Sequence, residues 1–516
     1  SQCLQLDGIV SGGGEDLLDL DDMRISLEDE PFQNPLISKV AECSSQLETP
    51  IAMRALLGID TAVFSVVSMF HPNLAALDVF GDKSTSDARR RCQPSAEENS
   101  KVLFDLHLRV AVLYTFVYSA FLHMPYCLEV LEPLMDEGNH PLCLVLGKES
   151  SIDTPWGLAK AYADEVFDFM KENDGWNADG SASREVNRVP FSDYAITDSA
   201  GNSWRPFIPQ NSPYQISDSK KWQALTEDNG LGFISVQRHV TPHIGATARF
   251  FGFNSTDDEA AFASRTADNP QYDRYKDMVK ALIEQTADTA NDNFKVDSIS
   301  FFDNKFTSLV PLKIAYFTRS ETTGLTALDF YRLTLEVQLA IYNGVILTWK
   351  EKIRWNMPRP PTVATASLGD ELVKAYAGPE DGVRIIKASE WEPFIRTMPH
   401  AEYPSASSCF CWLYAEQIWH YLGSDAIDPP LEYVTDNTTF EFSSWSQIAD
   451  ICGESRLWGG MHFDAAVSAA VELCGNFLVA GSISATLGRL IDGDETAAVF
   501  DRDAGELMVR EVHPRL

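Results

Sequence analysis

The chain has 516 residues, of which 45% are hydrophobic and 22% charged, and this composition excludes a mainly disordered or fibrous protein. Its 41 basic and 75 acidic residues give a formal charge of −34, so both nucleic acid and anionic lipid are expected to be repelled. No apolar run is both long enough and free enough of polar residues to predict a transmembrane segment. We therefore expect a soluble protein.

The N-terminal half shows apolar residues at helical spacing, separated by polar stretches. An acidic, Gly-rich arm is expected at residues 1–35, followed by an N-terminal helical region at 36–230. This region ends in a long loop at about 173–230, where Asn, Gly, Ser and Pro accumulate. The helices expected within it cover residues 51–80, 101–135 and 151–170.

The second half, residues 231–516, is more regular and is expected to form a C-terminal helical region. Helices are expected after a polar stretch at 257–274 and up to Ala290, at 324–352 before the prolines that start at Pro358, after Pro404, and at 464–490. Strand-like alternation is limited to residues 305–318 and 382–387. The predicted fold class is therefore mostly α with few short strands.

The nine cysteines are spread too widely for a small disulfide scaffold. Cys409 and Cys411 are the only close pair, and they lack both the spacing of a zinc site and a second pair. We expect both to be buried on a helix face. An odd count leaves at least one free thiol unless a bridge joins two chains, and disulfides remain open.

Three motifs in the second half suit a bound oxyanion. They are Trp349-Lys-Glu-Lys352 with Arg359-Pro360, then His400-Ala-Glu-Tyr-Pro-Ser405-Ala406-Ser407, then Ser455-Arg456 with His462. An oxyanion needs fixed hydrogen-bond donors on several sides. The planar guanidinium group of an arginine supplies several N–H donors, and the ammonium group of a lysine supplies a localised positive charge. A serine hydroxyl and the first N–H groups of a helix add directional donors. A turn at Gly459-Gly460 is expected to bring Arg456 and His462 to one cavity.

In this order the motifs resemble the Lys-x6-Arg-Pro, Pro-Ser-Gly-His and Ser-Arg-x5-His patterns of the vanadium-dependent haloperoxidase and type-2 phosphatidic acid phosphatase superfamily. The segment His239-Val-Thr-Pro-His243-Ile-Gly245 resembles haloperoxidase relatives as well. The resemblance implies a mostly α fold of helical bundles of the vanadium haloperoxidase type, in which residues 231–516 form the helical-bundle region that holds vanadate, or phosphate in its place. It implies that His462 is the axial ligand of vanadium, that Trp349 and His400 line a halide or substrate pocket, and that the anion is held by Lys352, Arg359, Ser405, Ala406 and Arg456.

One position departs from the family pattern, because Ser407 stands where the family has its acid–base histidine. A serine hydroxyl cannot transfer protons unaided at neutral pH. His400 falls where bromoperoxidases carry a second active-site histidine, and we expect it to take over proton transfer, with Lys352, His462 and Ser407 completing the catalytic set. Purely structural roles remain open for His239, His243, His400 and Ser407, and Glu402 is expected to pair with an arginine or to cap a helix.

The resemblance implies an enzyme of the bromo- or iodoperoxidase type, in which hydrogen peroxide oxidises the halide to hypohalous acid and a small organic acceptor is halogenated. Two alternatives remain. One is a phosphomonoesterase that forms a phosphohistidine at His462, and the other is an anion-binding homologue with a repurposed site. An extracellular or periplasmic location is expected from the family alone, and a homo-oligomer is left open.

Overall fold

The computed structural model describes residues 47–70 and 155–174, a few residues at 115–124 and 196–204, most of 207–492, and single residues up to 499. Within 207–492 the gaps are at 229–230, 243, 318, 320–323, 326, 436 and 476. The expected arm at 1–35, most of the expected helix at 101–135 and the end of the one at 51–80 therefore lie outside the described residues. His243 lies outside them as well.

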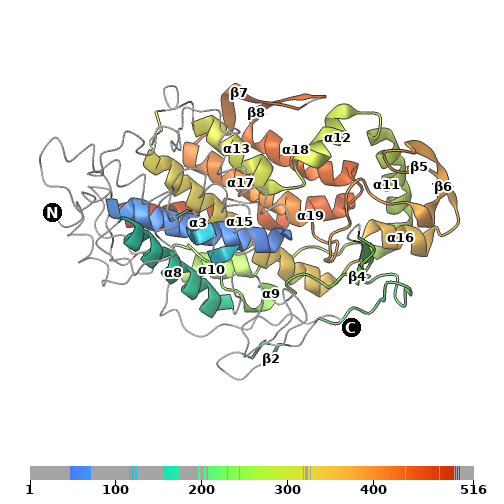
Figure 1. The fold of residues 1–516 in the computed structure, drawn as a ribbon, viewed down its shortest axis with the longest axis horizontal. Coiled ribbons are helices and arrows are strands. Elements are labelled where there is room, and N and C mark those ends of the chain that lie inside the picture. Colours follow the sequence, from blue (N-terminus) through green and yellow to red (C-terminus); the bar gives the residue numbers. More distant parts are fainter. Residues whose placement is uncertain are drawn as a thin grey trace, which may run out of the picture.

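The long helix α15 (Ala327–Trp355) lies at the centre of the fold (Figure 1). Every side chain from Leu335 to Trp349 is buried, which is typical of a helix enclosed on all sides. The helices α3 (Thr49–Phe70), α17 (Ala406–Leu422) and α20 (Leu478–Ile491) pack against it. The predicted bundle is confirmed, and the helices expected at 324–352 and after Pro404 are α15 and α17.

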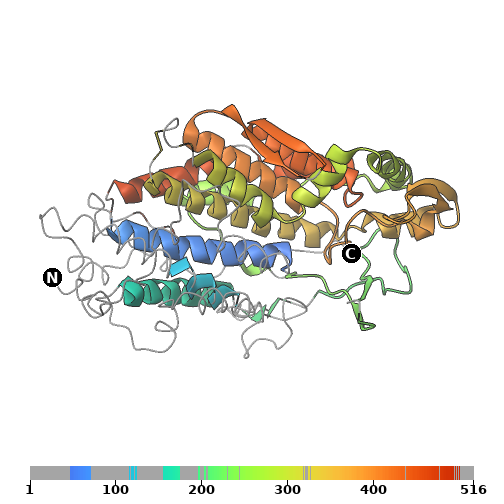
Figure 2. The ribbon, with the colours of Figure 1, turned by 45° about the horizontal axis from the view of Figure 1, so that its top comes forward.

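Further helices surround this centre. The helix α8 (Pro155–Asp174) lies along α3 in both views (Figures 1 and 2), as the expected helix at 151–170. The helices α18 (Trp445–Trp458) and α19 (Asp464–Cys474) pack on α17. The others are α9 (Ile244–Thr247), α10 (Thr256–Ala263), α11 (Tyr275–Thr289), α12 (Asn293–Phe301), α13 (Lys305–Phe317) and α16 (Pro360–Ser367), with 3-10 turns η4 (Tyr272–Arg274) and η5 (Ala388–Glu390).

The strands form four two-stranded antiparallel hairpins, among the residues that the structure describes. They are β1–β2 (Ile196–Thr197 with Ser203–Trp204), β3–β4 (Thr226–Asp228 with Ile234–Val236), β5–β6 (Leu372–Tyr376 with Val383–Lys387) and β7–β8 (Ala426–Val434 with Thr439–Ser444). The strand expected at 382–387 is β6. The loop region expected at 173–230 holds only short strands where it is described.

The strand expected at 305–318 is wrong, because these residues form the helix α13. Over so short a segment, apolar residues fit either period, and tertiary contacts decide. Leu309 and Leu312, one helical turn apart, are both buried in the main core. The hydroxyl of Tyr414 on α17 donates to the carbonyl of Leu309 at 2.8 Å, which ties α13 to the bundle.

The single helix expected at 464–490 is also wrong, since α19 and α20 are separate helices. Gly475 follows α19 with an extended backbone (φ −76°, ψ 124°), and Phe477 then adopts a left-handed conformation with φ 57°. A Cβ on Gly475 would lie 2.1 Å from Nε1 of Trp412, so the break is packed directly against α17. Helical spacing alone does not reveal such a break.

Two described segments are long and apolar enough to cross a membrane by length and composition, Thr49–Ser68 and Asp464–Ile491. The first is 94% buried inside the protein. The second is 53% buried and contains the break between α19 and α20. Burial against other helices accounts for the apolar character of the first segment.

Gly245 in α9 allows the segment after His239 to approach α15 closely. A Cβ built on Gly245 would lie 2.3 Å from the backbone nitrogen of Lys350, which cannot move without shifting α15. We expect Gly245→Ala to lower the free energy of unfolding by about 1–3 kcal/mol, measured by urea denaturation. The control is Gly481→Ala in α20, where the nearest atom is 3.5 Å away and no loss is expected. Equal stability of both variants would contradict this reading.

Candidate anion site

Four segments converge on one cluster of polar side chains. Lys352 lies near the end of α15, which stops where Asn356 takes a left-handed conformation with φ 50°. Arg359 follows as the residue before α16. The other two segments are the loop 400–404 that leads into α17 and the loop 459–462 that follows α18. The structure thus brings the three sequence motifs together.

Lys352 is fully buried, and its ammonium group holds the loop before α17. Its Nζ donates to the carbonyl oxygens of Ala401 (2.7 Å), Glu402 (3.0 Å) and Pro404 (2.6 Å). Burial lowers the pKa of Lys352 well below its usual value, and the nearby Arg359 lowers it further. A negatively charged ligand near Lys352 and Arg359 would stabilise the charged forms of both side chains.

Arg359 connects the two loops. Its Nε donates to the carbonyl of His400 at 2.8 Å, and its Nη1 donates to the carbonyl of Met461 at 3.1 Å. The same Nη1 lies 3.3 Å from Nε2 of His462, and Nη2 lies 2.9 Å from Nδ1 of His400. Burial lowers the pKa of Arg359 to about 10, while the Glu402 and Glu48 carboxylates act in the opposite direction. Both imidazoles therefore face one buried guanidinium group.

His462 is placed by the expected turn after α18. Gly459 follows the helix, Gly460 has φ 76°, and the N–H groups of Met461 and His462 both donate to the carbonyl of Arg456. Positive φ favours glycine here. Burial and the surrounding cations, first Arg359, lower the pKa of His462 well below its usual value. His462 is therefore a neutral imidazole at pH 7.

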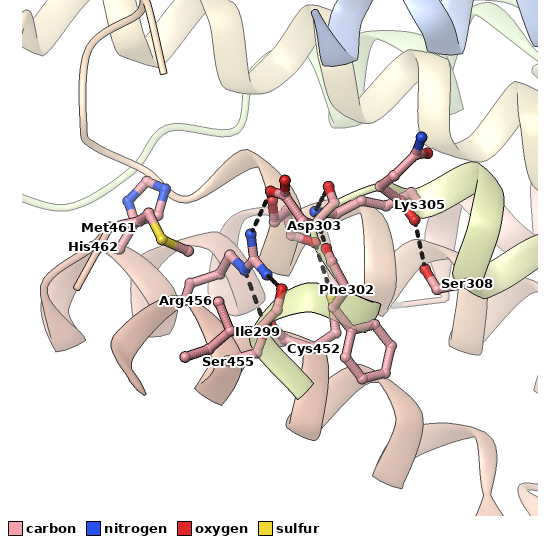
Figure 3. A network of polar contacts seen from close by, with 12 residues as sticks. Ile299, Phe302, Asp303, Lys305, Ser308, Cys452, Ser455, Arg456, Met461 and His462 are labelled. Atoms are coloured by element: carbon pink, nitrogen blue, oxygen red, sulfur yellow. Dashed lines mark hydrogen bonds and ion pairs between the residues drawn. The ribbon is translucent and has the colours of Figure 1, made fainter. Parts of the chain in front are cut away.

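Arg456 lies between His462 and a second polar network (Figure 3). It donates to the carbonyl of Ile299 at 3.0 Å and to Oγ of Ser455 at 3.1 Å, and it pairs with Asp303 at 3.4 Å. Lys305 is buried beside this pair and donates to the carbonyls of Phe302 and Asp303. Burial lowers the pKa of Lys305 well below its usual value, and Arg456 lowers it further.

The start of α17 supplies neutral donors. Ser405 precedes the helix, and its Oγ accepts from the N–H of Ser408 at 3.4 Å and from the Ser408 hydroxyl at 2.8 Å. Ala406 and Ser407 open the helix, where N–H groups have no intrahelical acceptor. The Ser407 side chain is half-buried, and it makes no hydrogen bond to the described residues. Nothing in this contact pattern gives Ser407 an acid–base partner.

His400 and Trp349 lie together, as expected, with ring centroids 4.9 Å apart. Trp349 is fully buried and its Nε1 donates to the carbonyl of Val240 at 2.9 Å. The ring of His239 lies 6.4 Å from that of His400, and its Nε2 accepts the N–H of Ala401 at 3.1 Å. Burial lowers the pKa of His400 well below its usual value, followed by the effect of Arg359. His400 is neutral and belongs to the cluster.

Glu402, Asp303 and Lys305 belong to the cluster but were not identified as site residues from the sequence. Glu402 pairs with His462 (Nδ1 to Oε1, 3.0 Å), so the expectation of an arginine partner or helix cap was wrong. Burial raises the pKa of Glu402 to about 7, although a backbone N–H and two cations oppose this. The only sequence signal for Glu402 is its position within the second motif, residues 400–407. No motif marked Asp303 or Lys305.

The donor set fits an oxyanion better than a cation. Lys352, Arg359, Arg456 and Lys305 are buried, whereas Asp303 is partly exposed and Glu402 has a raised pKa. Buried cations that repel one another are stabilised by a bound anion. Among the described residues, no three His, Cys, Asp or Glu side chains group as a metal site. The residues present therefore fit vanadate or phosphate, with His462 available as one direct ligand.

A cavity of about 970 Å³ lies beside this cluster, and its lining includes Pro361 of α16 and Thr397. In its wall Arg396 pairs with Glu48 and Glu227, both at 2.7 Å. The lining does not include Lys352, Arg359 or His462.

His239 offers a test of a neutral buried imidazole. Burial lowers its pKa to about 3, so below pH 6.5 the unfolded chain binds a proton that the folded protein does not. The free energy of unfolding therefore has its full value above pH 6.5 and decreases as the pH falls below 6.5, because protonation of His239 stabilises the unfolded chain. We expect the stability difference between wild type and His239→Gln to shrink by about 1.4 kcal/mol per pH unit between pH 6 and 4, measured by urea denaturation. If the free energies of unfolding of wild type and His239→Gln changed equally with pH, the neutral state of buried His239 would be contradicted.

Comparison with known proteins identifies the fold that carries these residues. Residues 332–493 match the family model of the VCPO second helical-bundle domain, VCPO being vanadium chloroperoxidase. The structure is similar to a holo-type bacterial vanadium-dependent chloroperoxidase, with 19% identity, a TM-score of 0.69, and coverage of 93% of this chain and 100% of the other. An apo-type bacterial enzyme gives 20% identity, a TM-score of 0.67, and coverage of 86% and 94%.

A bacterial vanadium-dependent iodoperoxidase gives 15% identity, a TM-score of 0.52, and coverage of 88% of this chain and 96% of the other. No protein of curated function gives a significant sequence match. The matched range 332–493 contains the three motifs, from Trp349 to His462. The chain therefore has the fold of these vanadium-dependent haloperoxidase structures, and its residues 332–493 are similar to the VCPO second helical-bundle domain.

Proposed function

We propose that this protein is a vanadate-dependent haloperoxidase that oxidises bromide or iodide with hydrogen peroxide. The observation that supports this most directly is the convergence of four buried cationic side chains near the imidazole of His462, in a chain whose net charge is −34. Vanadate, when bound, supplies a Lewis-acidic centre that activates hydrogen peroxide towards attack by a halide.

The protein side chains have distinct parts in this proposal. Arg359 and Arg456 hold the negative oxygens of the anion, and the first N–H groups of α17 add neutral donors. Lys352, whose three N–H groups are donated to backbone carbonyls, adds positive charge beside the anion. Trp349 and His400 exclude water from one side, because both are buried. His400 accepts a proton from hydrogen peroxide in this proposal, because burial lowers its pKa but a bound anion would offset the further lowering by Arg359 and Lys352. Products of this chemistry are hypohalous acid and halogenated small organic acceptors.

The direct test is peroxide-dependent bromination of an organic dye, with and without added vanadate, together with vanadium analysis of the protein. Bromination that requires vanadate supports the proposal. Hydrolysis of p-nitrophenyl phosphate without bromination would instead favour a phosphomonoesterase, in which His462 attacks phosphorus. Ser407 in place of an acid–base histidine weakens that alternative, because leaving groups would depart unprotonated. Anion binding with neither activity would indicate a repurposed site.

His400→Ala is expected to lower the rate of bromination at least about 100-fold while vanadate affinity changes little, because a positioned base is lost. Ser407→Ala is the control, and it should retain activity because the Ser407 side chain makes no hydrogen bond to the described residues. The measurement is the rate at saturating vanadate. Unchanged turnover in His400→Ala would exclude His400 as the proton carrier, and Ser407→His would then show whether an imidazole at that position restores proton transfer.

A further inference from the structure

Glu402 is a buried carboxylate whose only side-chain partner among the described residues is His462. Its Oε1 lies 3.0 Å from Nδ1 of His462 and accepts from the N–H of Phe463 at 3.0 Å. Its Oε2 has no partner in the described part of the chain. The side chain is fully buried, so water does not replace these contacts. The carboxylate therefore acts on the residue expected to contact the anion.

The two nitrogens of His462 face groups of opposite kind. Nδ1 meets the carboxyl oxygen of Glu402, while Nε2 lies 3.3 Å from Nη1 of Arg359. A guanidinium group has only hydrogens to offer, so Nε2 must present its lone pair. The proton of the neutral ring then sits on Nδ1, where it is donated to Glu402. Both contacts assign the same tautomer.

The backbone of Glu402 is fixed independently. Its N–H donates to the carbonyl of Met357 at 3.1 Å, and its own carbonyl accepts from Lys352 at 3.0 Å. The residue is thus anchored to the end of α15 while its side chain reaches His462. The carboxylate fixes the orientation of the imidazole relative to Lys352 and Arg359.

We propose that Glu402 is a positioning residue that holds His462 as the Nδ1–H tautomer, so that the Nε2 lone pair faces the bound oxyanion. This inference rests on the oxyanion site of the proposed function. Only a nitrogen with a free lone pair can bond to the central atom of vanadate or phosphate. A carboxylate at the opposite nitrogen also stabilises the positive charge that develops on the ring when Nε2 donates its electrons.

The test compares Glu402→Ala and Glu402→Gln with wild type. The tautomer of His462 is read from ¹⁵N chemical shifts in histidine-labelled protein without anion, and its signals are assigned by comparison with His462→Gln. We expect protonated Nδ1 in wild type, largely retained in Glu402→Gln because the amide oxygen still accepts. In Glu402→Ala the Nε2–H tautomer should appear, and the dissociation constant for phosphate and vanadate, measured by calorimetry, should rise at least about 30-fold.

A matched control is Glu336→Gln, which alters a buried carboxylate of α15 that bonds Arg332, Gln417 and Ser484 instead. It should leave both the His462 tautomer and the anion affinity unchanged, even if stability falls. An Nε2–H tautomer in wild type, or an unaltered tautomer and affinity in Glu402→Ala, would overturn the proposal. If wild type binds neither anion but Glu402→Ala still changes the tautomer, the oxyanion site is wrong and the positioning of His462 by Glu402 stands.

Discussion

Replacing Arg359 by methionine is expected to raise the dissociation constant for phosphate or vanadate at least about 100-fold, or ~3 kcal/mol. Methionine has no donor for the carbonyls of His400 and Met461, which Arg359 joins. His400 and His462 therefore lose the guanidinium group that contacts both of them, and the anion loses the N–H donors of that group. Arg359→Lys should recover only part of the affinity, because an ammonium group cannot reach several acceptors in one plane. Calorimetric titration measures each constant.

The control for this prediction is Arg384→Met on β6, whose guanidinium is exposed and pairs with Asp381 at 2.8 Å. It removes one positive charge from the protein without touching the cluster, so the anion affinity should stay within about twofold of wild type. Unfolding curves show whether either variant has lost its structure. If folded Arg359→Met binds both anions as tightly as Arg384→Met, the assignment of Arg359 to the anion site is incorrect.

Replacing Cys411 and Cys452 together by alanine is expected to lower the free energy of unfolding by about 4 kcal/mol, measured by urea denaturation. These cysteines form a disulfide between residues 41 positions apart in the chain, which restricts the unfolded state. The bridge also joins the first turns of α17, next to Ser405, to α18, which carries Arg456. We therefore expect phosphate affinity to fall several-fold as well.

The disulfide between Cys409 and Cys474 provides the comparison, since it spans 65 positions and joins α17 to the end of α19. Its removal should cost similar stability, about 4 kcal/mol, with a smaller effect on phosphate affinity because α19 ends away from His462. Equal loss of affinity in both double variants would mean that general stability, and not the α17–α18 connection, sets anion binding. If neither double variant lowered the free energy of unfolding, the disulfides would not stabilise the protein by restricting the unfolded chain.

Parts of the fold were predictable because they depend on local chemistry. The apolar spacing of residues 324–352 and the prolines from Pro358 predicted α15 correctly, and Pro404 with Ser405 predicted the start of α17. Cys409 and Cys411 are buried as expected, but their partners Cys474 and Cys452 could not be chosen from spacing. The helix at α13 and the break at Gly475 depend on contacts with α17, which lies far away in sequence.

The sequence by itself determined the residue types of the proposed anion site and their order, since Lys352, Arg359, Arg456 and His462 stand in motifs that can be identified from spacing. Only the tertiary structure decided that Glu402 faces His462 and that Asp303 and Lys305 lie beside Arg456. The physical reason is that a motif reports positions along one segment, whereas the partner of a buried charge is set by how separate segments pack. A buried cation has lost its contacts with water, so it needs hydrogen-bond acceptors from the segments that pack around it.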